Sequence, residues 1–316
     1  MKPYAIGVDI GGTSVKLGLF SSDGTLMTKW EIPTITDNNG SGILSDVAHS
    51  ISQTLAERGI GIDQVEGIGF GVPGAVDENN LVLSCVNLGW KNVDITKEMT
   101  RSLPGCPRIR SANDANAATL GEVWKGSGTG RSSAVMITLG TGVGGGVVLD
   151  GKIIPGTWLC AGEIGHMKVE PGDNTPCNCG KSGCLEQYAS AKGIARMARD
   201  MLAQCDTPSP LRDMDPFTAK DICSLAQEGD PMALAIVDRC AAYLGLALSY
   251  VACTVDPGIF IVGGGMSRAG DVLLDPIRTY YRKNAFLNSD QTPIVAARLG
   301  NDAGIYGCAC MVLSTQ

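Results

Sequence analysis

Three cysteines lie within eight positions of the chain, Cys177, Cys179 and Cys184, and one of its two histidines, His166, lies shortly before them. Zn²⁺ prefers four tetrahedral ligands, and three thiolates with one imidazole form a known structural zinc set. Nothing at the N-terminus resembles a secretory signal, so we expect a reducing compartment, where clustered cysteines bind metal rather than form disulfides. The sequence therefore predicts a structural zinc site made of His166, Cys177, Cys179 and Cys184.

Two other interpretations of the cysteine cluster remain open at this level. The three thiols could simply be free, or an all-cysteine site could recruit Cys160 as its fourth ligand. In a metal site, the binding free energy would hold Glu163 and Glu186, at the two ends of the segment, in fixed positions. A loop would then act as a rigid wall carrying two carboxylates.

A second candidate is the glycine turn Asp9-Ile10-Gly11-Gly12-Thr13, which joins two strand-like segments. It fits neither a Walker loop nor a dinucleotide-binding turn, because both of those open a helix. Gly11 and Gly12 would let the backbone approach a phosphate, and Asp9 would hold Mg²⁺ through water. An ordinary hairpin turn explains the segment equally well.

The chain repeats this pattern far downstream, where a strand is expected at Ala134–Leu139, a glycine-rich turn at Gly140–Gly146 and a second strand at Val147–Leu149. The stretch Thr138–Gly146 contains five glycines. Glycines inside strands cost roughly 0.5–1 kcal/mol each, so such a run needs a reason. Two phosphate-facing turns would provide one. The two copies of strand, glycine turn and strand also predict an internal duplication whose halves face each other across a cleft.

A third candidate, Asn113-Asp114-Ala115-Asn116, begins a predicted helix directly after a strand at Arg108–Ser111. Asn and Asp are preferred N-cap residues, so capping alone explains one of them. The other could place a carboxylate beside a substrate hydroxyl. Cap and base are both compatible with the residues.

The composition is that of a globular protein and argues against some kinds of partner. The chain has 316 residues, is 44% hydrophobic and 18% charged, and has a formal net charge of −7 with no Lys/Arg-rich run, which argues against a nucleic-acid partner. The longest apolar stretch, Ala233–Val255, contains Asp238 and Arg239, so we expect a buried helix with Asp230 as N-cap and no membrane partner. A second small-residue helix, Ala303–Leu313, is expected to pack on the first half of the chain.

With these residues in view, the chain resembles the ROK family (repressors, open reading frames and kinases), and within it the glucokinases of Gram-positive bacteria. The resemblance runs nearly end to end, and the joint order of the motifs is highly specific. They are Asp9–Thr13, Gly71–Gly74, Asn87–Trp90, Asn113–Asn116, Gly140–Gly146, Glu163–His166 and the Cys-x-Cys-Gly-x-x-Gly-Cys-x-Glu segment Cys177–Glu186.

The resemblance implies an α/β protein with the actin-like ATPase (ribonuclease H-like) fold, in which two duplicated α/β domains surround a nucleotide cleft. We expect a smaller domain of residues 1–118 plus 303–316, with the first phosphate turn and the catalytic residue. Residues 119–302 would form a larger domain with the second phosphate turn, the zinc site, the sugar wall and the dimerisation surface.

The resemblance also implies roles for individual residues. Asp114 would be the catalytic base, and His166 would serve both zinc and sugar. The sugar-binding set would be Gly74, Asn113, Asp114, Glu163, His166 and Glu186. The nucleotide-binding set would be Asp9, Gly11, Gly12, Thr13, Gly140, Thr141, Gly142, Gly263, Gly264 and Gly265, the last three near the adenosine.

The implied activity is transfer of a phosphoryl group from Mg·ATP to the 6-hydroxyl of a hexose, with glucose favoured, in a cytoplasmic homodimer or homotetramer. Fructose, allose, mannose and N-acetylmannosamine are alternative acceptors. Trp158-Leu159-Cys160 departs from the small residues that glucokinases show before Glu163, which bears on the preferred hexose. A non-catalytic sugar sensor is a rival. A sugar-responsive repressor is another, but it would need a DNA-binding domain before the strand that starts at Tyr4.

Overall fold

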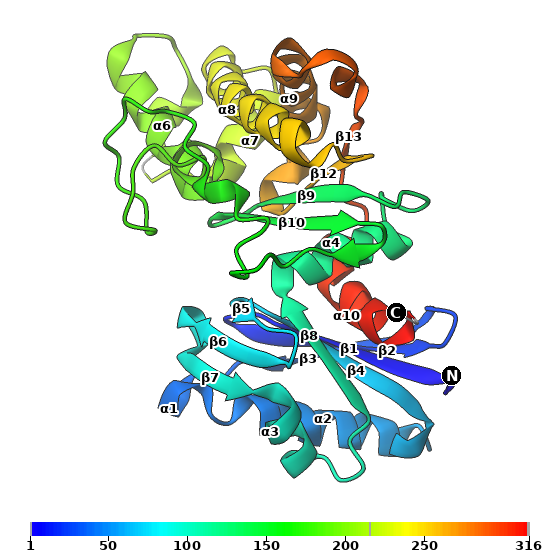
Figure 1. Cartoon of the computed structure of the whole chain (residues 1–316). Coiled ribbons are helices and arrows are strands. Elements are labelled where there is room, and N and C mark those ends of the chain that lie inside the picture. Colours follow the sequence, from blue (N-terminus) through cyan, green and yellow to red (C-terminus); the bar gives the residue numbers. More distant parts are fainter. Residues whose placement is uncertain (1, 215, 315–316) are drawn as a thin grey trace. The chain divides into compact units, whose positions relative to one another are not determined.

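The computed structural model describes residues 2–214 and 216–314 (Figure 1). The chain forms two compact units: unit 1 comprises Met1–Gly130, Gly146–Ala161 and Asn301–Gln316, and unit 2 comprises Arg131–Gly145 and Gly162–Gly300. These bounds differ from the expected domains 1–118 plus 303–316 and 119–302, because unit 1 also includes residues 119–130, 146–161 and 301–302. Residues 1, 315 and 316 of the first expected domain lie outside the described residues.

Unit 1 is built on a five-stranded sheet of order β3-β2-β1-β4-β8, with a small sheet β5-β6-β7 beside it. Apolar side chains of β1, β2 and β4 alternate with small residues and pack against α2 in one continuous core. Its elements are β1 (Tyr4–Ile10), β2 (Ser14–Ser21), β3 (Leu26–Pro33), α1 (Asp37–Gly40), α2 (Ile43–Glu57), β4 (Val65–Val72), β5 (Ala75–Val76), β6 (Leu81–Cys85), β7 (Trp90–Asp94), α3 (Ile95–Ser102), β8 (Arg108–Asn113), α4 (Asp114–Lys125), β11 (Lys152–Ile153) and α10 (Ala303–Leu313).

The C-terminal helix α10 packs on the first half of the chain, as the sequence predicts. Its backbone lies so close to β1 and β4 that a Cβ on Gly7 would overlap the carbonyl of Ile305, and one on Gly69 that of Cys308. The contact with α4 is equally close, since a Cβ on Gly121 would overlap the carbonyl of Ala303. Glycine at these positions therefore lets α10 pack closely on the middle of β1 and β4 and against α4.

Unit 2 consists mainly of helices beside a few strands, and β12 pairs in parallel with both β9 and β13. Its elements are β9 (Ala134–Leu139), the first residues of β10 (Val143–Leu149), α5 (Glu186–Ala189), α6 (Ala191–Gln204), α7 (Ala219–Gln227), α8 (Pro231–Val255), β12 (Phe260–Gly263), α9 (Asp271–Asn284) and β13 (Ile294–Ala296).

The long helix α8 begins as predicted, with the Asp230 carboxylate accepting from the Ala233 amide at 2.8 Å and Pro231 in the first turn. Of the helices in the described residues, it is the one long and apolar enough to match a membrane span by length and composition. Most of its apolar stretch is buried within the protein, and a Cβ on Gly245 would meet the backbone of Tyr281 on α9. These contacts are those of a core helix.

The second five-stranded sheet has the order β11-β10-β9-β12-β13, which repeats the order of the first sheet position by position. This repetition agrees with the duplication predicted from the two glycine turns. One expected boundary is wrong: β10 begins at Val143, inside the segment expected to be a turn up to Gly146. Close approach to other backbone segments requires glycine there, since a Cβ on Gly145 would overlap the carbonyl of Gly162.

Candidate active site and metal cluster

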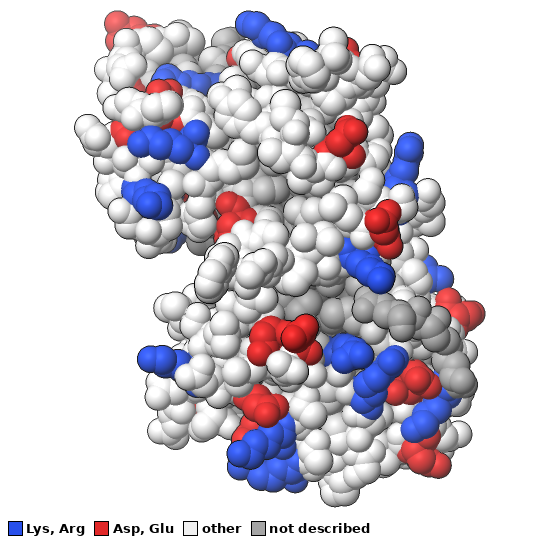
Figure 2. Space-filling view, viewed as in Figure 1, with Lys and Arg blue, Asp and Glu red and all other residues white. Residues whose placement is uncertain are grey.

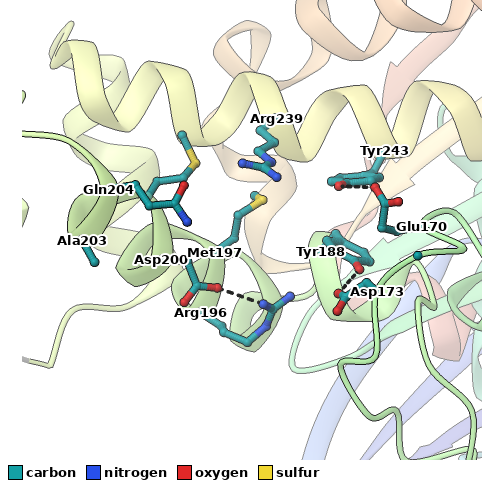
Figure 3. Close-up of a pocket in the computed structure, with 12 residues that line it drawn as sticks. Glu170, Asp173, Tyr188, Arg196, Met197, Asp200, Ala203, Gln204, Arg239 and Tyr243 are labelled. Carbon is teal, nitrogen blue, oxygen red and sulfur yellow. Dashed lines mark hydrogen bonds and ion pairs between the residues drawn. The ribbon is translucent and has the colours of Figure 1, made fainter.

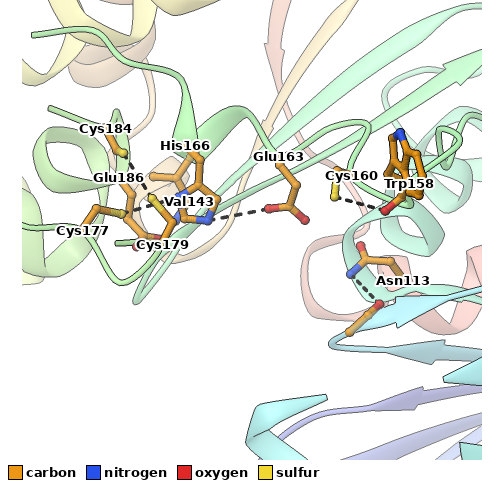
Figure 4. Close-up of polar contacts among 11 residues, drawn as sticks. Asn113, Val143, Trp158, Cys160, Glu163, His166, Cys177, Cys179, Cys184 and Glu186 are labelled. Carbon is orange, nitrogen blue, oxygen red and sulfur yellow. Dashed lines mark hydrogen bonds and ion pairs between the residues drawn. The ribbon is translucent and has the colours of Figure 1, made fainter. Parts of the chain in front are cut away.

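The four predicted metal ligands lie together in unit 2. The ligand atoms of His166, Cys177, Cys179 and Cys184 all lie within 4.8 Å of one another (Figure 4). Cys179 Sγ and Cys184 Sγ are 3.7 Å apart, and Cys177 Sγ is 3.6 Å from His166 Nδ1. Tetrahedral Zn²⁺ with Zn–S of ~2.3 Å and Zn–N of ~2.0–2.1 Å separates such atom pairs by about 3.8 and 3.6 Å. The donor set and its spacing therefore fit zinc.

Glycines shape the loop that carries the cysteines. Gly180 has φ +81° and closes a tight turn in which its amide donates to the Cys177 carbonyl at 2.9 Å. Gly183 has φ +69°, and a Cβ there would overlap the carbonyl of Glu170. All four ligand residues of this cluster belong to unit 2, whereas Cys160 belongs to unit 1, where its thiol donates to the carbonyl of Trp158 at 3.2 Å. With four ligands from unit 2 alone, the site does not need Cys160 to complete a tetrahedral set.

The thiols of the cluster are electrostatically unequal. Burial, followed by the neighbouring Cys179 and Cys177, raises the pKa of the Cys184 thiol to about 12. The backbone amide of Lys181 lowers the pKa of Cys179, which is exposed. Cys184 therefore stays protonated at neutral pH unless a cation offsets the cost of its thiolate.

The predicted sugar-binding residues of unit 2 surround this cluster. The ring of His166 turns Nδ1 toward the cysteines and Nε2 toward Glu163, whose carboxylate lies 3.9 Å away (Figure 4). The Glu186 carboxylate accepts from the Val143 amide at 3.0 Å. A Cβ on Gly142 would overlap that carboxylate, so the structure places Gly142 against Glu186.

Two stacked tyrosines hold the segment between His166 and Cys177. The rings of Tyr188 and Tyr243 lie 4.2 Å apart between centroids. The Tyr188 hydroxyl donates to Asp173, and that of Tyr243 donates to Glu170 at 3.1 Å (Figure 3). The loop that leads to the cysteines is therefore fixed to α5 and α8. The cavity beside these tyrosines contains none of the predicted site residues.

The second glycine turn opens into a cavity of about 490 Å³ within unit 2. Gly140 and Thr141 line it together with Gly265, three residues that the sequence assigned to the nucleotide. Gly142, Gly263 and Gly264 are not among its lining residues. Gly264, at φ +84°, makes the sharp turn that leaves β12, where a Cβ would overlap Leu139.

The sequence did not identify the opposite wall of this cavity. It consists of α7 from its N-cap to its last residue and of the turn after β12, with Thr218, Lys220, Ser224, Gln227, Met266 and Arg268. The capping box of Thr218 and Asp221 marks the start of α7 and was the available signal. Without tertiary contacts, nothing in the sequence connects α7 to the glycine turn.

In unit 1, the junction of β8 and α4 shows which residue caps the helix, a question that the sequence left open between Asn113 and Asp114. The Asn113 side chain caps α4, accepting from the amides of Ala115 at 3.0 Å and Asn116 at 3.2 Å. Asp114 is therefore not needed as the cap. Its carboxylate accepts from the Ala115 amide at 2.9 Å, and hydrogen bonds from its own amide and from the Asn113 side chain also act to lower its pKa. Burial raises the pKa of Asp114, which makes it a stronger base than an exposed aspartate.

Asp9, the last residue but one of β1, lies near this junction and interacts electrostatically with Asp114. Burial, and next the charge of Asp114, raise the pKa of Asp9 to about 7, while Lys16 acts to lower it. A Cβ on Gly304 would lie 2.5 Å from the Asp9 carboxylate, so the first turn of α10 packs directly on it. Two adjacent carboxylates of raised pKa fit a place where a divalent cation is received.

The remaining predicted residues of unit 1 form two groups. Asn113 Nδ2 donates to the Gly74 carbonyl at 3.4 Å, so the structure brings these two together. Gly11, Gly12 and Thr13 form the β1–β2 turn, in which the Gly11 amide donates to the Ser14 carbonyl at 2.9 Å. Gly12 and Thr13 are exposed at the tip, with open space where a Cβ on Gly12 would lie.

The segment Trp158-Leu159-Cys160, which differs from the small residues expected before Glu163, lies in unit 1. The Trp158 side chain is 86% exposed and packs into no core. Leu159, at φ +59°, lines a cavity of about 500 Å³ that Asn113, Asn116 and Val76 also line. The segment therefore shares a cavity with one predicted sugar-binding residue.

Comparison with known proteins places these features in a family. Residues 5–315 match the ROK family model. The glucokinase of Halalkalibacterium halodurans is 40% identical over 98% of this chain and 94% of its own length, and that of Thermotoga maritima 37% identical over 97% and 96%. A ROK glucokinase from Streptomyces griseus, solved with glucose and AMPPNP, superposes with a TM-score of 0.75 at 33% identity over 98% of both chains.

The fold is the actin-like α/β fold of the ROK sugar kinases, as the sequence predicts. The chain belongs to the ROK family.

Proposed function

We propose that this protein transfers the γ-phosphoryl group of Mg·ATP to the 6-hydroxyl of a hexose, with glucose as the preferred acceptor. The observation that carries the proposal is the junction of β8 and α4. There Asn113 provides the cap and leaves the carboxylate of Asp114 available as a base, in a chain that matches glucokinases along nearly its whole length.

In the proposed reaction, the carboxylate of Asp114 accepts the proton of the sugar 6-hydroxyl. The sugar oxygen forms a bond to the γ-phosphorus, the bond from that phosphorus to the β–γ bridging oxygen breaks, and ADP leaves. The transition state of phosphoryl transfer is loose, so the base mainly positions the hydroxyl and takes its proton late. The base belongs to unit 1 and the nucleotide cavity to unit 2, so the reaction needs both.

The 490 Å³ cavity of unit 2 is proposed to hold the adenosine. Its size suits a nucleoside, and its lining mixes apolar atoms of Met266 and Ala219 with polar groups of Ser224 and Thr218. The glycine turn at Gly140–Gly142 would then present backbone amides to the phosphates. Asp9, at the first glycine turn, would hold the Mg²⁺ that accompanies the nucleotide.

A structural Zn²⁺ is proposed at His166, Cys177, Cys179 and Cys184. When bound, it would make the loop rigid, and its positive charge would offset the free-energy cost of deprotonating the Cys184 thiol. With Nδ1 on the metal, His166 keeps Nε2 for a sugar hydroxyl, beside Glu163. Glu186, held by the Val143 amide, would bind a further hydroxyl.

The similarity to glucokinases and the composition also support proposals on location, assembly and partners. We expect a cytoplasmic enzyme of carbohydrate metabolism, assembled as a homodimer or homotetramer, without a nucleic-acid or membrane partner. Residues 1–118 plus 303–316 would provide the first phosphate turn and the base, and 119–302 the second turn, the zinc and the dimerisation surface. On the face shown in Figure 2, basic and acidic side chains are interspersed, unlike a nucleic-acid-binding surface.

The direct test measures ADP release with Mg·ATP and a panel of glucose, mannose, fructose, allose and N-acetylmannosamine. We expect kcat/KM to be highest for glucose. A different best hexose would keep the kinase but correct its substrate, and Leu159, beside Asn113, is where that selectivity would be sought. Binding of glucose with no ADP release for any hexose would contradict the kinase and favour the sugar sensor.

Removing one cluster cysteine tests the zinc site. Cys179→Ser is expected to abolish stoichiometric zinc and lower the melting temperature, because the loop loses a ligand that stabilises it. Zinc content by atomic spectroscopy and thermal unfolding measure the two effects. Cys253→Ser, which changes an exposed cysteine outside the cluster, is the matched control. Unchanged zinc and melting temperature in Cys179→Ser would argue against the metal.

A further inference from the structure

Lys16 is a cation at the first glycine turn that none of the predicted roles uses. It lies on β2 directly opposite Asp9 on β1, so both side chains project from the same face of the sheet. The next pair on that face, Gly7 and Gly18, is covered by α10. Asp9 and Lys16 are therefore the last pair on this face before the turn at Gly11–Thr13.

The ammonium of Lys16 has a weak partner in the structure. Among the ion pairs of residues 2–214 and 216–314, none joins Lys16, although Glu31 lies directly opposite it on β3. Instead, Nζ donates to the backbone carbonyl of Asn301 at 3.4 Å, just before α10. Lys29, two register positions along the same face, pairs with the Asp302 carboxylate at 2.6 Å. Two lysines on one face therefore differ in whether a carboxylate neutralises them.

The local charge balance explains why a cation is needed here. Asp114 places a carboxylate near the turn that would repel an incoming polyphosphate, and Asp9 adds a second one whenever it is ionised and holds no cation. A half-buried lysine without a carboxylate partner offers the compensating charge, and ammonium groups bind phosphate as point charges. Its long stem lets Nζ move from the Asn301 carbonyl to a ligand at the turn.

We propose that Lys16 binds the triphosphate of the nucleotide at the β1–β2 turn. This inference rests on the proposed function, because it assumes that the turn receives Mg·ATP. It adds a side-chain contact to a site otherwise made of backbone amides and Asp9. The contact is directed to the phosphates and not to the adenosine, which the cavity of unit 2 would bind separately.

The test compares binding of Mg·AMPPNP and of adenosine by isothermal titration calorimetry in wild type, Lys16→Met, Lys16→Arg and Lys29→Met. We expect Lys16→Met to weaken Mg·AMPPNP binding about 10- to 100-fold, the range for a lost charge-assisted contact, with adenosine binding unchanged. Lys16→Arg should restore most of the affinity, since it keeps the charge. Lys29→Met should bind Mg·AMPPNP like wild type.

Equal affinity of Lys16→Met and wild type for Mg·AMPPNP would overturn the role of Lys16. Equal losses for adenosine and Mg·AMPPNP would also overturn it, since they indicate a structural effect. Failure of the proposed function looks different: wild-type protein would release no ADP with any hexose, whatever the binding data show for Lys16.

Discussion

Asp114→Asn is expected to lower kcat for glucose phosphorylation at least ~10²-fold, the usual contribution of a general base, while the glucose KM changes little. Asparagine keeps the size of the side chain and its ability to accept from the Ala115 amide, so the start of α4 should stay intact. The cap itself comes from Asn113. Steady-state kinetics with saturating Mg·ATP, together with far-UV circular dichroism, measure the two properties.

The control for this variant is Asp46→Asn, an exposed aspartate on α2 of the same unit. It should keep wild-type kcat. If Asp114→Asn retained kcat with glucose, Asp114 would not be the base. If it lost glucose binding as well as turnover, the carboxylate would be holding the sugar rather than accepting its proton.

Sequence reasoning was strongest where local chemistry determines structure. The caps at Asp230 and Asn113 depend on side-chain to backbone hydrogen bonds within one turn. The Asp230 cap was predicted, and at the start of α4 the sequence predicted a cap but left open whether Asn113 or Asp114 provides it. The proximity of His166 to the three cysteines was also predicted, because four ligand-type residues within about twenty positions have few other common purposes.

The sequence predicts least well those features that depend on contacts between segments far apart in the chain. β10 begins four residues earlier than expected, since its glycines allow close backbone approach rather than a longer turn. The wall that α7 contributes to the 490 Å³ cavity depends on tertiary packing, and the position of Lys16 opposite Asp9 depends on strand register. The hydrophobic periodicity of the sequence specifies neither the packing of α7 nor the pairing of Lys16 with Asp9.

Asp9→Asn is expected to stabilise unit 1 at pH 8 while it removes activity. The pKa of Asp9 is raised from 3.8 to about 7, first by burial and then by Asp114. The folded protein therefore holds a proton that the unfolded chain releases above pH ~4, and stability falls as pH rises from there through about 7. A shift of about three units corresponds to about 4 kcal/mol, and partial exposure of Asp9 screens this to about 2–4 kcal/mol.

The pH dependence distinguishes this explanation from a general packing effect. The neutral amide of asparagine avoids the cost of the charge, so its gain in unfolding free energy should be largest at pH 8 and fall to about half at pH 5.5. All four tryptophans belong to unit 1, so urea unfolding followed by tryptophan fluorescence reports on the correct unit. Asp46→Asn, at an exposed position of the same unit, is the matched control for the effect of the substitution itself.

The same substitution should weaken Mg·ATP binding, because the carboxylate proposed to hold the cation is gone. A stabilised but inactive variant would indicate that the fold keeps Asp9 for function at a cost to stability, as sites built for charged ligands often do. A gain of equal size at pH 8 and pH 5.5 would mean that Asp9 is not protonated in the folded state near neutral pH. A loss of stability at pH 8 would mean that its carboxylate is already neutralised within unit 1, and that Lys16 is its permanent partner rather than a ligand for phosphate.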